Sequence, residues 1–291
     1  MEISAQLVKE LRDSSGAGMM DAKKALMACD GNMEEAVDWL RAKGLSKAAK
    51  KSDRVASDGL IGIYRDETGA VAVEINSETD FVAKNGDFQR MVSSITSAAI
   101  NAENVEDLLN KDINGSTVQD ILTNHIATIG ENLSLRRMIK FSGKDIATYI
   151  HNSVGEGLGR LAVLVSFEGG NFDLARQVAM HIAASNPIAI SEEDIDPAVL
   201  EREKNIFIQQ AKDSGKPDNI IESMVNGRLK KYFEEVVLLK QKFVIDPEIT
   251  VKEALEKQAL KVINFKRISV GEGIEKEQEN FADEVAKTIG S

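Results

Sequence analysis

Cysteine is nearly absent from this chain: Cys29 is the only one among 291 residues, so no disulfide can form within the chain. A single free thiol is typical of proteins from a reducing compartment. The chain also lacks any run approaching the ~18 consecutive apolar residues of a membrane-spanning helix. Its first residues lack the basic start and apolar stretch of a signal peptide. These absences predict a cytoplasmic protein without a membrane segment.

Positive charge is in short supply as well. The chain has 36 lysines and arginines against 47 aspartates and glutamates, which gives a formal net charge of −11. Binding to a phosphate backbone depends on a basic surface, so this balance argues against direct contact with nucleic acid. A protein partner is the better expectation for any surface that binds.

Catalytic motifs are also missing. The chain has three histidines and no HExxH, CxxC or GxxxxGK[ST] pattern. His125 and His181 lie within apolar helical patterns, where a structural histidine is the ordinary interpretation. The glycine-rich run at residues 155–159 has no helix directly behind it to present amides to a phosphate, so a β-hairpin connection is expected. The sequence therefore predicts a non-enzymatic protein without a metal or cofactor of its own.

What is present is an ordinary globular composition, with 43% hydrophobic and 29% charged residues and enough length for about two domains. Residues 1–54 predict a bundle of three short amphipathic helices and a linker. Asn32 and Glu35 are spaced as a capping box at the start of the third helix. Val37 is expected on its inner face and Gly44 at its end. A basic, solvated connector should follow over residues 45–58. Its length suggests that the bundle moves, or is positioned, independently of the rest of the chain.

The remaining chain predicts an α+β core with antiparallel sheets, built from two subdomains. Residues 55–144 should form the first, with a hairpin over residues 60–64 and 71–75, two helices, and a strand whose residues 133, 135, 137, 139 and 141 share one face. Residues 145–190 and 238–270 should form the second subdomain. Both parts have the same order of strands and helices, which suggests a duplication.

Between the two pieces of the second subdomain, residues 191–237 predict a helical-hairpin arm that protrudes from the core. Glycine and proline in residues 214–217 mark the turn. Val199 and Ile206, like Leu200 and Phe207, lie seven residues apart, a spacing that suits a coiled coil. Such an arm is expected to contact a partner or a second copy of the chain. Residues 271–291 should form a C-terminal module with a short helix that includes Phe281, Val285 and Ile289.

The most unusual stretch is residues 76–84, a strand-to-helix turn with Phe81 between Asp80 and Lys84. Judged from these residues alone, the favoured interpretation is structural: Phe81 would staple the turn to the core and Asp80 would cap the following helix. The alternative is an exposed aromatic wedge with a charge at its base. Met19 and Met20 pose the same choice between a staple and a soft contact patch for a partner.

Several strings, taken together, resemble bacterial elongation factor Ts over essentially the whole chain. The most specific are GAGMMD at residues 16–21 and TDFVAK at residues 79–84. Others follow in the order of the family: KKAL at 23–26, IGEN at 129–132, RR at 136–137, AMHIAAS at 179–185, SGKP at 214–217 and VGEGIEK at 270–276.

This resemblance implies a guanine-nucleotide exchange factor for elongation factor Tu, whose bound GDP and Mg²⁺ belong to the partner. It implies that the turn disturbs the partner's Mg²⁺ site through Thr79, Asp80, Phe81 and Val82. It also implies other partner contacts, at Arg12, Met19, Met20, Lys23, Ile129, Gly130, His151, Val244 and Ile245. The bundle would resemble ubiquitin-associated domains, and the arm would serve association of two copies in relatives that dimerise.

The chain departs from the family pattern at four places. Ser15 stands where threonine is usual, Glu78 where some relatives have glutamine, and Ile245 where methionine is common; the loop over residues 151–160 is longer than usual. Two other functions stay open: a scaffold or chaperone-like binding module, and a metal-dependent hydrolase that uses scattered carboxylates. Release of GDP from elongation factor Tu distinguishes exchange from both.

Overall fold

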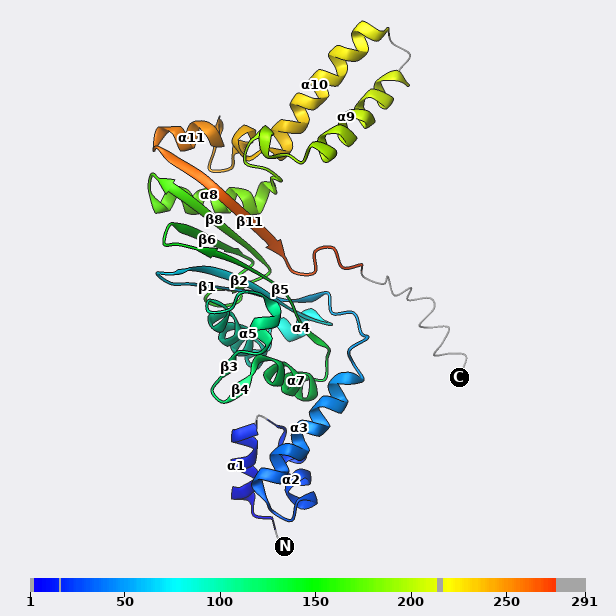
Figure 1. Ribbon diagram of the computed structural model, residues 1–291, viewed down its shortest axis with the longest axis vertical. Coiled ribbons are helices and arrows are strands. Elements are labelled where there is room, and N and C mark those ends of the chain that lie inside the picture. The colour runs from blue at the N-terminus through cyan, green and yellow to red at the C-terminus, as the bar shows by residue number, and fades with distance from the viewer. Residues whose placement is uncertain (1–2, 16, 214–216, 276–291) are drawn as a thin grey trace.

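The computed structural model describes residues 3–15, 17–213 and 217–275, and shows an elongated molecule (Figure 1). A three-helix bundle lies at one end and a helical arm at the other. Between them, two helix-covered sheets pack against each other, so that the core has four layers: helices, sheet, sheet and helices. The expected α+β fold with antiparallel sheets is confirmed.

The bundle consists of α1 (Ala5–Ser15), α2 (Met19–Ala28) and α3 (Met33–Ala49). Apolar side chains from all three helices form its core: Val8, Leu11, Ala22, Ala25, Leu26, Ala36 and Leu40. The Asn32 side chain caps α3 by accepting from the backbone N–H groups of Glu34 and Glu35. Since helices this short are marginal alone, this shared core holds them together.

Two predictions about α3 are wrong. Val37 is 41% exposed instead of inward-facing, and the helix continues through Gly44 as far as Ala49. Gly44 is buried because α3 crosses α7 (Val118–Ile129) at this point, and a Cβ here would meet Thr123 and Ala127 of α7 at about van der Waals distance. The glycine therefore marks a close helix contact, and the expected basic connector is in part the last turn of a helix.

The first sheet has the strand order β5-β2-β1-β7, formed by β1 (Asp58–Arg65), β2 (Gly69–Ser77), β5 (Leu133–Ser142) and β7 (Leu158–Gly159). Its outer face is covered by α5 (Gly86–Ala99) and α7. The small elements α4 (Asp80–Ala83), α6 (Val105–Leu109), β3 (Asp112–Ile113) and β4 (Ser116–Thr117) complete this half. The glycine-rich run connects two antiparallel strands, as expected of a hairpin connection, and it also supplies β7, whose pairing with β1 was not expected.

The second sheet has the order β11-β8-β6, formed by β6 (Ile146–His151), β8 (Leu161–Gly169) and β11 (Leu260–Ser269). Its outer face carries α8 (Phe172–Ser185) and α11 (Val251–Lys257), near the short hairpin of β9 (Lys242–Phe243) and β10 (Asp246–Thr250). In the first half, β2 pairs with both β1 and β5. In the second half, β8 pairs in the same way with both β6 and β11. The common order expected from the sequence is therefore present in space.

Alternation along the central strands explains the four layers. Val71, Val73 and Ile75 of β2 face the helices of the first half. Ala70 and Ala72 face the other sheet, where Leu164 of β8 meets them. Because both faces of β2 are covered, its side chains are buried along the whole strand.

Strand β5 forms as predicted, but its apolar residues do not share one face. A β-bulge shifts the register between the pairs Glu74↔Arg137 and Ile75↔Leu135. One extra residue exchanges the two faces of a strand. Leu133 and Leu135 therefore face the helices, whereas Ile139 and Phe141 face the second sheet.

The arm consists of α9 (Pro197–Lys212) and α10 (Asp218–Val236), which lie side by side and extend away from the sheets (Figure 1). A ring contact between Phe207 and Tyr232, with centroids 6.2 Å apart, joins the two helices. Val199 and Ile206 are 40% and 38% exposed, so one of the two predicted heptad rows faces solvent. The turn at residues 214–216 and the predicted C-terminal helix beyond residue 275 lie outside the described residues.

A buried carboxylate joins the first sheet to the end of β11. Glu74 is fully buried, accepts from Arg136 at 3.2 Å and from the Gly271 N–H at 2.8 Å, and also bonds Arg137. Burial disfavours the charged form of Glu74, but these bonds outweigh it and lower its pKa. The bulge at Arg136 brings both arginines to this one carboxylate.

Glu74→Ala should lower the free energy of unfolding by about 3 kcal/mol, because two partly buried arginines lose their shared counter-ion. The control is Glu272→Ala, which removes a half-exposed carboxylate 3.1 Å from the same Arg137 and should cost less than about 1 kcal/mol. Urea unfolding measures both values. Equal losses would contradict the assigned role of Glu74.

Candidate functional site

The turn after β2 holds a phenylalanine away from the protein. Phe81 is 75% exposed, the highest exposed fraction among the large apolar residues of the described chain. The next two residues, Val82 and Ala83, are buried in the core of the first half. The one-turn helix α4 thus turns Phe81 outward and anchors itself through its neighbours. The prediction that Phe81 staples the turn to its own core is wrong.

Asp80 and Lys84 flank this ring. The Asp80 carboxylate accepts from the Lys84 Nζ at 2.8 Å, and the same Nζ lies 5.4 Å from the Phe81 ring centroid. Asp80 is the first residue of α4 and does not cap the next helix. Asn85 caps α5 instead, by accepting from the N–H groups of Asp87 and Phe88. The predicted cap at Asp80 is therefore wrong, and its carboxylate is left at the surface beside Phe81.

Thr79 is fixed from the other side by Glu131. The carboxylate of Glu131 accepts from the Thr79 N–H at 3.0 Å and from its hydroxyl at 2.7 Å. Both bonds tie the entrance of α4 to the segment that follows α7. Sequence analysis missed Glu131, although it lies within the IGEN string, because no spacing rule connects residues 52 positions apart.

Ile129 and Gly130 belong to the same segment and lie next to this pair. Gly130 ends α7 with φ of 90°, a left-handed conformation that suits glycine. Its carbonyl accepts a hydrogen bond from Lys51, just past α3. The structure therefore brings the predicted residues Thr79, Ile129 and Gly130 together.

The additional charge of Glu78 is compensated within the chain. Its carboxylate accepts from the Asn132 N–H at 2.5 Å and lies 3.5 Å from Arg54. Glu78 is only partly exposed, and its bonds to Asn132 and Arg54 hold the start of the turn in place. The departure from glutamine therefore leaves Asp80 as the carboxylate next to the exposed ring.

The predicted contact residues of the bundle all lie at its surface. Met19 and Met20 are 48% and 65% exposed, which disagrees with a role as staples, and Arg12 and Lys23 are exposed too. Arg12 lines a groove that also contains Ile129. This groove joins the surface of the bundle to that of the first half of the core.

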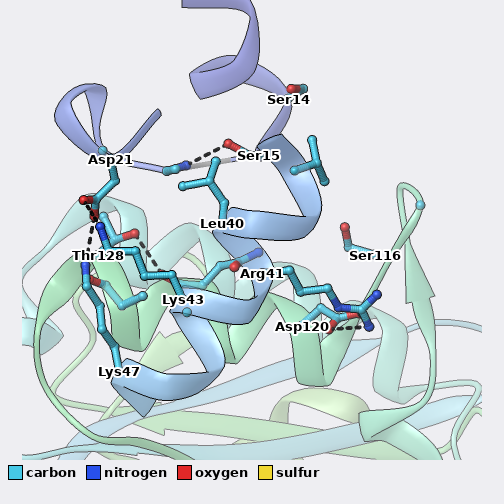
Figure 2. Close-up of a pocket in the computed structure, with 17 residues that line it drawn as sticks. Ser14, Ser15, Asp21, Leu40, Arg41, Lys43, Lys47, Ser116, Asp120 and Thr128 are labelled. Carbon is cyan, nitrogen blue, oxygen red and sulfur yellow. Dashed lines mark hydrogen bonds and ion pairs between the residues drawn. The ribbon is translucent and has the colours of Figure 1, made fainter. Parts of the chain in front are cut away.

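Ion pairs fasten α2 to α3 within the bundle. Figure 2 shows Asp21 of α2 between Lys43 and Lys47 of α3, at 2.7 and 2.9 Å. These two hydrogen bonds lower the pKa of Asp21 to about 2. Asp21 ends the GAGMMD string, and its role could not be inferred from that string alone because both lysines come from another helix.

The same helix α3 is fastened to α7 in the core. Arg41 lies 3.0 Å from Asp120 (Figure 2). Lys47 Nζ lies 3.4 Å from the Ala127 carbonyl oxygen. Together with the close approach at Gly44, these contacts fix α3 to α7, and α3 in turn holds α2. The prediction that a long connector lets the bundle move independently is not supported by this packing.

A second group of predicted contact residues lies in the other half of the core. Val244 and Ile245 are 45% and 44% exposed at the tip between β9 and β10. His151 is exposed at the end of β6, and its Nδ1 lies 3.1 Å from the Tyr149 hydroxyl. The structure thus presents two separate candidate surfaces, one around Phe81 and the bundle and one on the second half.

Among residues 3–15, 17–213 and 217–275, no group of three or more His, Cys, Asp or Glu side chains is arranged to hold a metal ion. No helix in that part of the chain is both long and apolar enough to cross a membrane.

Comparison with known proteins gives one family. The family model described as elongation factor TS matches residues 78–272. The elongation factor Ts of Dinoroseobacter shibae is 54% identical over 289 residues, and that of Ruegeria sp. (strain TM1040) is 55% identical over 287 residues. The elongation factor Ts of Paracoccus denitrificans is 54% identical over 292 residues. Each alignment covers 99% of both chains.

The pairing of Asp21 with Lys43 and Lys47 can be tested by titration. In a carboxyl NMR titration, Asp21 should titrate at about 2, against an ordinary value of 3.8. Because the folded-state pKa is lowered, the stabilisation by Asp21 is complete above pH ~4 and is lost as the pH falls toward ~2. Replacing Lys43 and Lys47 with alanine should return the midpoint close to the ordinary value.

Arg41→Ala is the matched control, since Arg41 lies on the same helix and is paired with Asp120 instead. It should leave the Asp21 midpoint where it is. A midpoint near 3.8 in the unchanged protein would show that the two lysines do not hold this carboxylate in solution.

Proposed function

This chain belongs to the elongation factor Ts family of translation elongation factors, and from that membership we propose that it is the guanine-nucleotide exchange factor of elongation factor Tu. It would bind the GDP form of that GTPase, disturb the Mg²⁺ and nucleotide site, and release GDP so that GTP can load. It would act in the cytoplasm, and it would form and break no covalent bond.

The exposure of Phe81 is the observation that carries this proposal. Large apolar side chains are mostly buried, although single exposed ones are common, so the degree of exposure and the anchoring of the turn carry the argument. Here the ring is 75% exposed on a turn whose neighbours are anchored in the core. A rigidly held aromatic is the residue type that dominates protein interfaces. It suits a wedge that inserts between elements of a partner.

The energetics of exchange are compatible with one such wedge. An exchange factor must bind the nucleotide-free GTPase better than the nucleotide-bound form, and by linkage it weakens nucleotide binding by the same factor. One buried aromatic anchor contributes about 2 kcal/mol or more, equivalent to about 30-fold in an equilibrium constant. Mg²⁺ demands near-ideal octahedral geometry, so a small displacement of its ligands removes much of the hold on the nucleotide.

Asp80 would bring a negative charge to the neighbourhood of that Mg²⁺. Its side chain is 49% exposed and, within the part of the chain that the structure describes, paired only with Lys84, which is itself 67% exposed. Such a surface pair contributes ~0–1 kcal/mol, so Asp80 can exchange its partner at little cost. Thr79 and Val82 would act through the shape of the turn, one held by Glu131 and the other by the core.

The other predicted residues would supply attachment. Arg12, Met19, Met20 and Lys23 form the exposed side of a bundle that is fastened to the core, and Val244 and Ile245 with His151 offer a second surface. Two attachment points on one rigid body would fix the direction in which Phe81 enters the partner.

Phe81→Ala should slow the release of labelled GDP from elongation factor Tu by about 30-fold at limiting factor, because it removes the wedge. Its midpoint of thermal unfolding should hardly change, since the ring makes few contacts within the chain. The measurement is fluorescence of labelled GDP after mixing with excess unlabelled nucleotide.

The control is Phe172→Ala, which removes a 38% exposed phenylalanine from the second half of the core and should leave the release rate unchanged. A folded Phe81→Ala variant with full activity would remove Phe81 from the mechanism. Binding of the unchanged protein without faster release would favour the scaffold function. If it neither binds nor accelerates release, the hydrolase alternative reopens.

We further propose self-association through the arm. Val199, Ile206 and Ile220 are each about 40% exposed on α9 and α10, and a row of apolar residues at coiled-coil spacing favours a second helix pair. Sedimentation of the free protein should show a mass that rises with concentration. Replacing Val199 and Ile206 with serine should abolish this rise, whereas a monomer at all concentrations in the unchanged protein would contradict it.

A further inference from the structure

A fully buried histidine lies directly beneath the exposed tip of the second half. His181 belongs to α8, and its side chain has no exposed surface. Its ring is 5.8 Å from that of Phe243, which is buried and immediately precedes the tip residues Val244 and Ile245. The histidine therefore connects the interior of the second half to one of the two candidate contact surfaces.

The hydrogen bonds around the ring determine where its proton lies. The Val244 N–H donates to the Nδ1 of His181 at 3.2 Å, so Nδ1 must be unprotonated. On the opposite side, the Nε2 lies 2.8 Å from the Gln241 Oε1. A neutral imidazole has one donor and one acceptor nitrogen, so Nε2 carries the hydrogen and donates it to Gln241.

The amide of Gln241 gives the same answer independently. Its Nε2 lies 2.6 Å from the Glu235 carbonyl oxygen and 3.4 Å from that of Ser185. Carbonyl oxygens only accept, so this end of the amide must be the NH₂ group and the end toward His181 must be the oxygen. The network thus runs without conflict from the base of the arm through Gln241 and His181 to the backbone of Val244.

We propose that neutral His181, with its hydrogen on Nε2, is the positioning residue that holds Val244 and Ile245 in the exposed conformation in which they bind the partner, and that protonation of its ring releases them. This inference rests on the proposed function, in which these two residues contact elongation factor Tu.

The tip is short, so its conformation depends on the hydrogen bond from the Val244 N–H to His181. Phe243 pairs with Asp246 across the hairpin, so Val244 and Ile245 are the two residues that make the turn. Strand β9 is only two residues long. A protonated ring would carry a hydrogen on Nδ1 that points at the Val244 N–H, and two donors cannot face each other. The tip would have to reorient.

The environment of the ring favours the neutral form. Burial lowers the pKa of His181 below its ordinary value of 6.5, and the bond to Gln241 opposes this only in part. Neither cause is a charge. Most charged residues of the surrounding elements are exposed: Arg176, Glu234, Glu235, Lys240, Lys242, Asp246, Glu248, Lys252 and Glu253. Arg267 of β11 is less exposed, at 18%, and its Nε lies 3.4 Å from the Ala183 carbonyl oxygen. Since the ring of the folded protein takes up its proton only below pH 6.5, the positioned tip is complete above this pH and is lost as the pH falls through the lowered pKa of His181.

Two substitutions of His181 each remove one of the two hydrogen bonds of its ring and keep the other. His181→Asn places an amide oxygen where Nδ1 accepts from Val244 and loses the bond to Gln241. His181→Gln places an amide nitrogen where Nε2 donates to Gln241 and loses the acceptor for Val244. Each variant keeps one hydrogen bond and leaves one buried group unpaired, so both should unfold at similarly lowered temperatures.

The experiment measures the dissociation constant of each full-length protein with nucleotide-free elongation factor Tu. At pH 7.5, His181→Asn should stay within about threefold of the unchanged protein, while His181→Gln should bind about tenfold more weakly because the Val244 N–H has lost its acceptor. Between pH 7.5 and 5.5 the unchanged protein should lose affinity relative to His181→Asn, which has no imidazole to protonate. The ratio of the two constants cancels any titration of the partner.

A measurement on the free protein tests the tautomer separately. The ¹⁵N shifts of the His181 ring should show a protonated Nε2 and an unprotonated Nδ1 at pH 7.5. Equal affinities of the two variants, or weaker binding by His181→Asn than by His181→Gln, would overturn the inference while leaving exchange intact. If the unchanged protein does not bind elongation factor Tu at all, the proposed function itself fails.

Discussion

The exposed position of Phe81 depends on the burial of the two residues after it. Folding back onto any apolar surface within reach would lower the free energy of an aromatic ring in water. Val82 and Ala83 prevent this because they are fixed in the core beneath α4, which leaves the ring on the outside of a single helical turn. Glu131 adds a second restraint by holding Thr79 with two hydrogen bonds. The turn is thus determined at both ends, and the sheet behind it, packed on both faces, gives it a rigid base.

The same restraints extend to the bundle. Glu131 follows Gly130, whose carbonyl binds Lys51 just beyond α3. Helix α3 packs against α7 at Gly44 and holds α2 through Asp21. A continuous series of contacts therefore runs from the exposed ring to the surface that carries Met19 and Met20. Each surface ion pair in this series is weak alone, and the close helix packing makes the arrangement stiff. On the proposed function, this stiffness would let distant surfaces act on one partner.

Much of this fold could be predicted from the sequence, and the failures have physical causes. Periodicity and caps gave the helices of the bundle, the arm and both halves of the core, because local spacing decides which side chains share a face. Gly44 was misjudged because a glycine that ends a helix and one that admits a neighbouring helix look alike in sequence. The bulge at Arg136 depends on pairing with Glu74 of another strand, and the roles of Glu131, Asp21 and His181 depend on residues far away in the chain. The residues around Phe81 offered its exposure only as the less favoured alternative, since its neighbours also suit a staple, and the resemblance was needed to prefer it.

Linkage divides the contacts with a partner into those that change its nucleotide affinity and those that only hold it. Only interactions that differ between the nucleotide-bound and nucleotide-free partner change nucleotide affinity. A contact made equally with both forms raises affinity for both and leaves the exchange equilibrium unchanged. On the proposed function, the bundle and the tip at Val244 and Ile245 would act mainly in this second way, because they lie apart from the turn that carries the wedge. Phe81 and Asp80 would then supply the difference. Such a factor could then tune how long it stays bound, through the tip and His181, independently of how strongly it loosens the nucleotide.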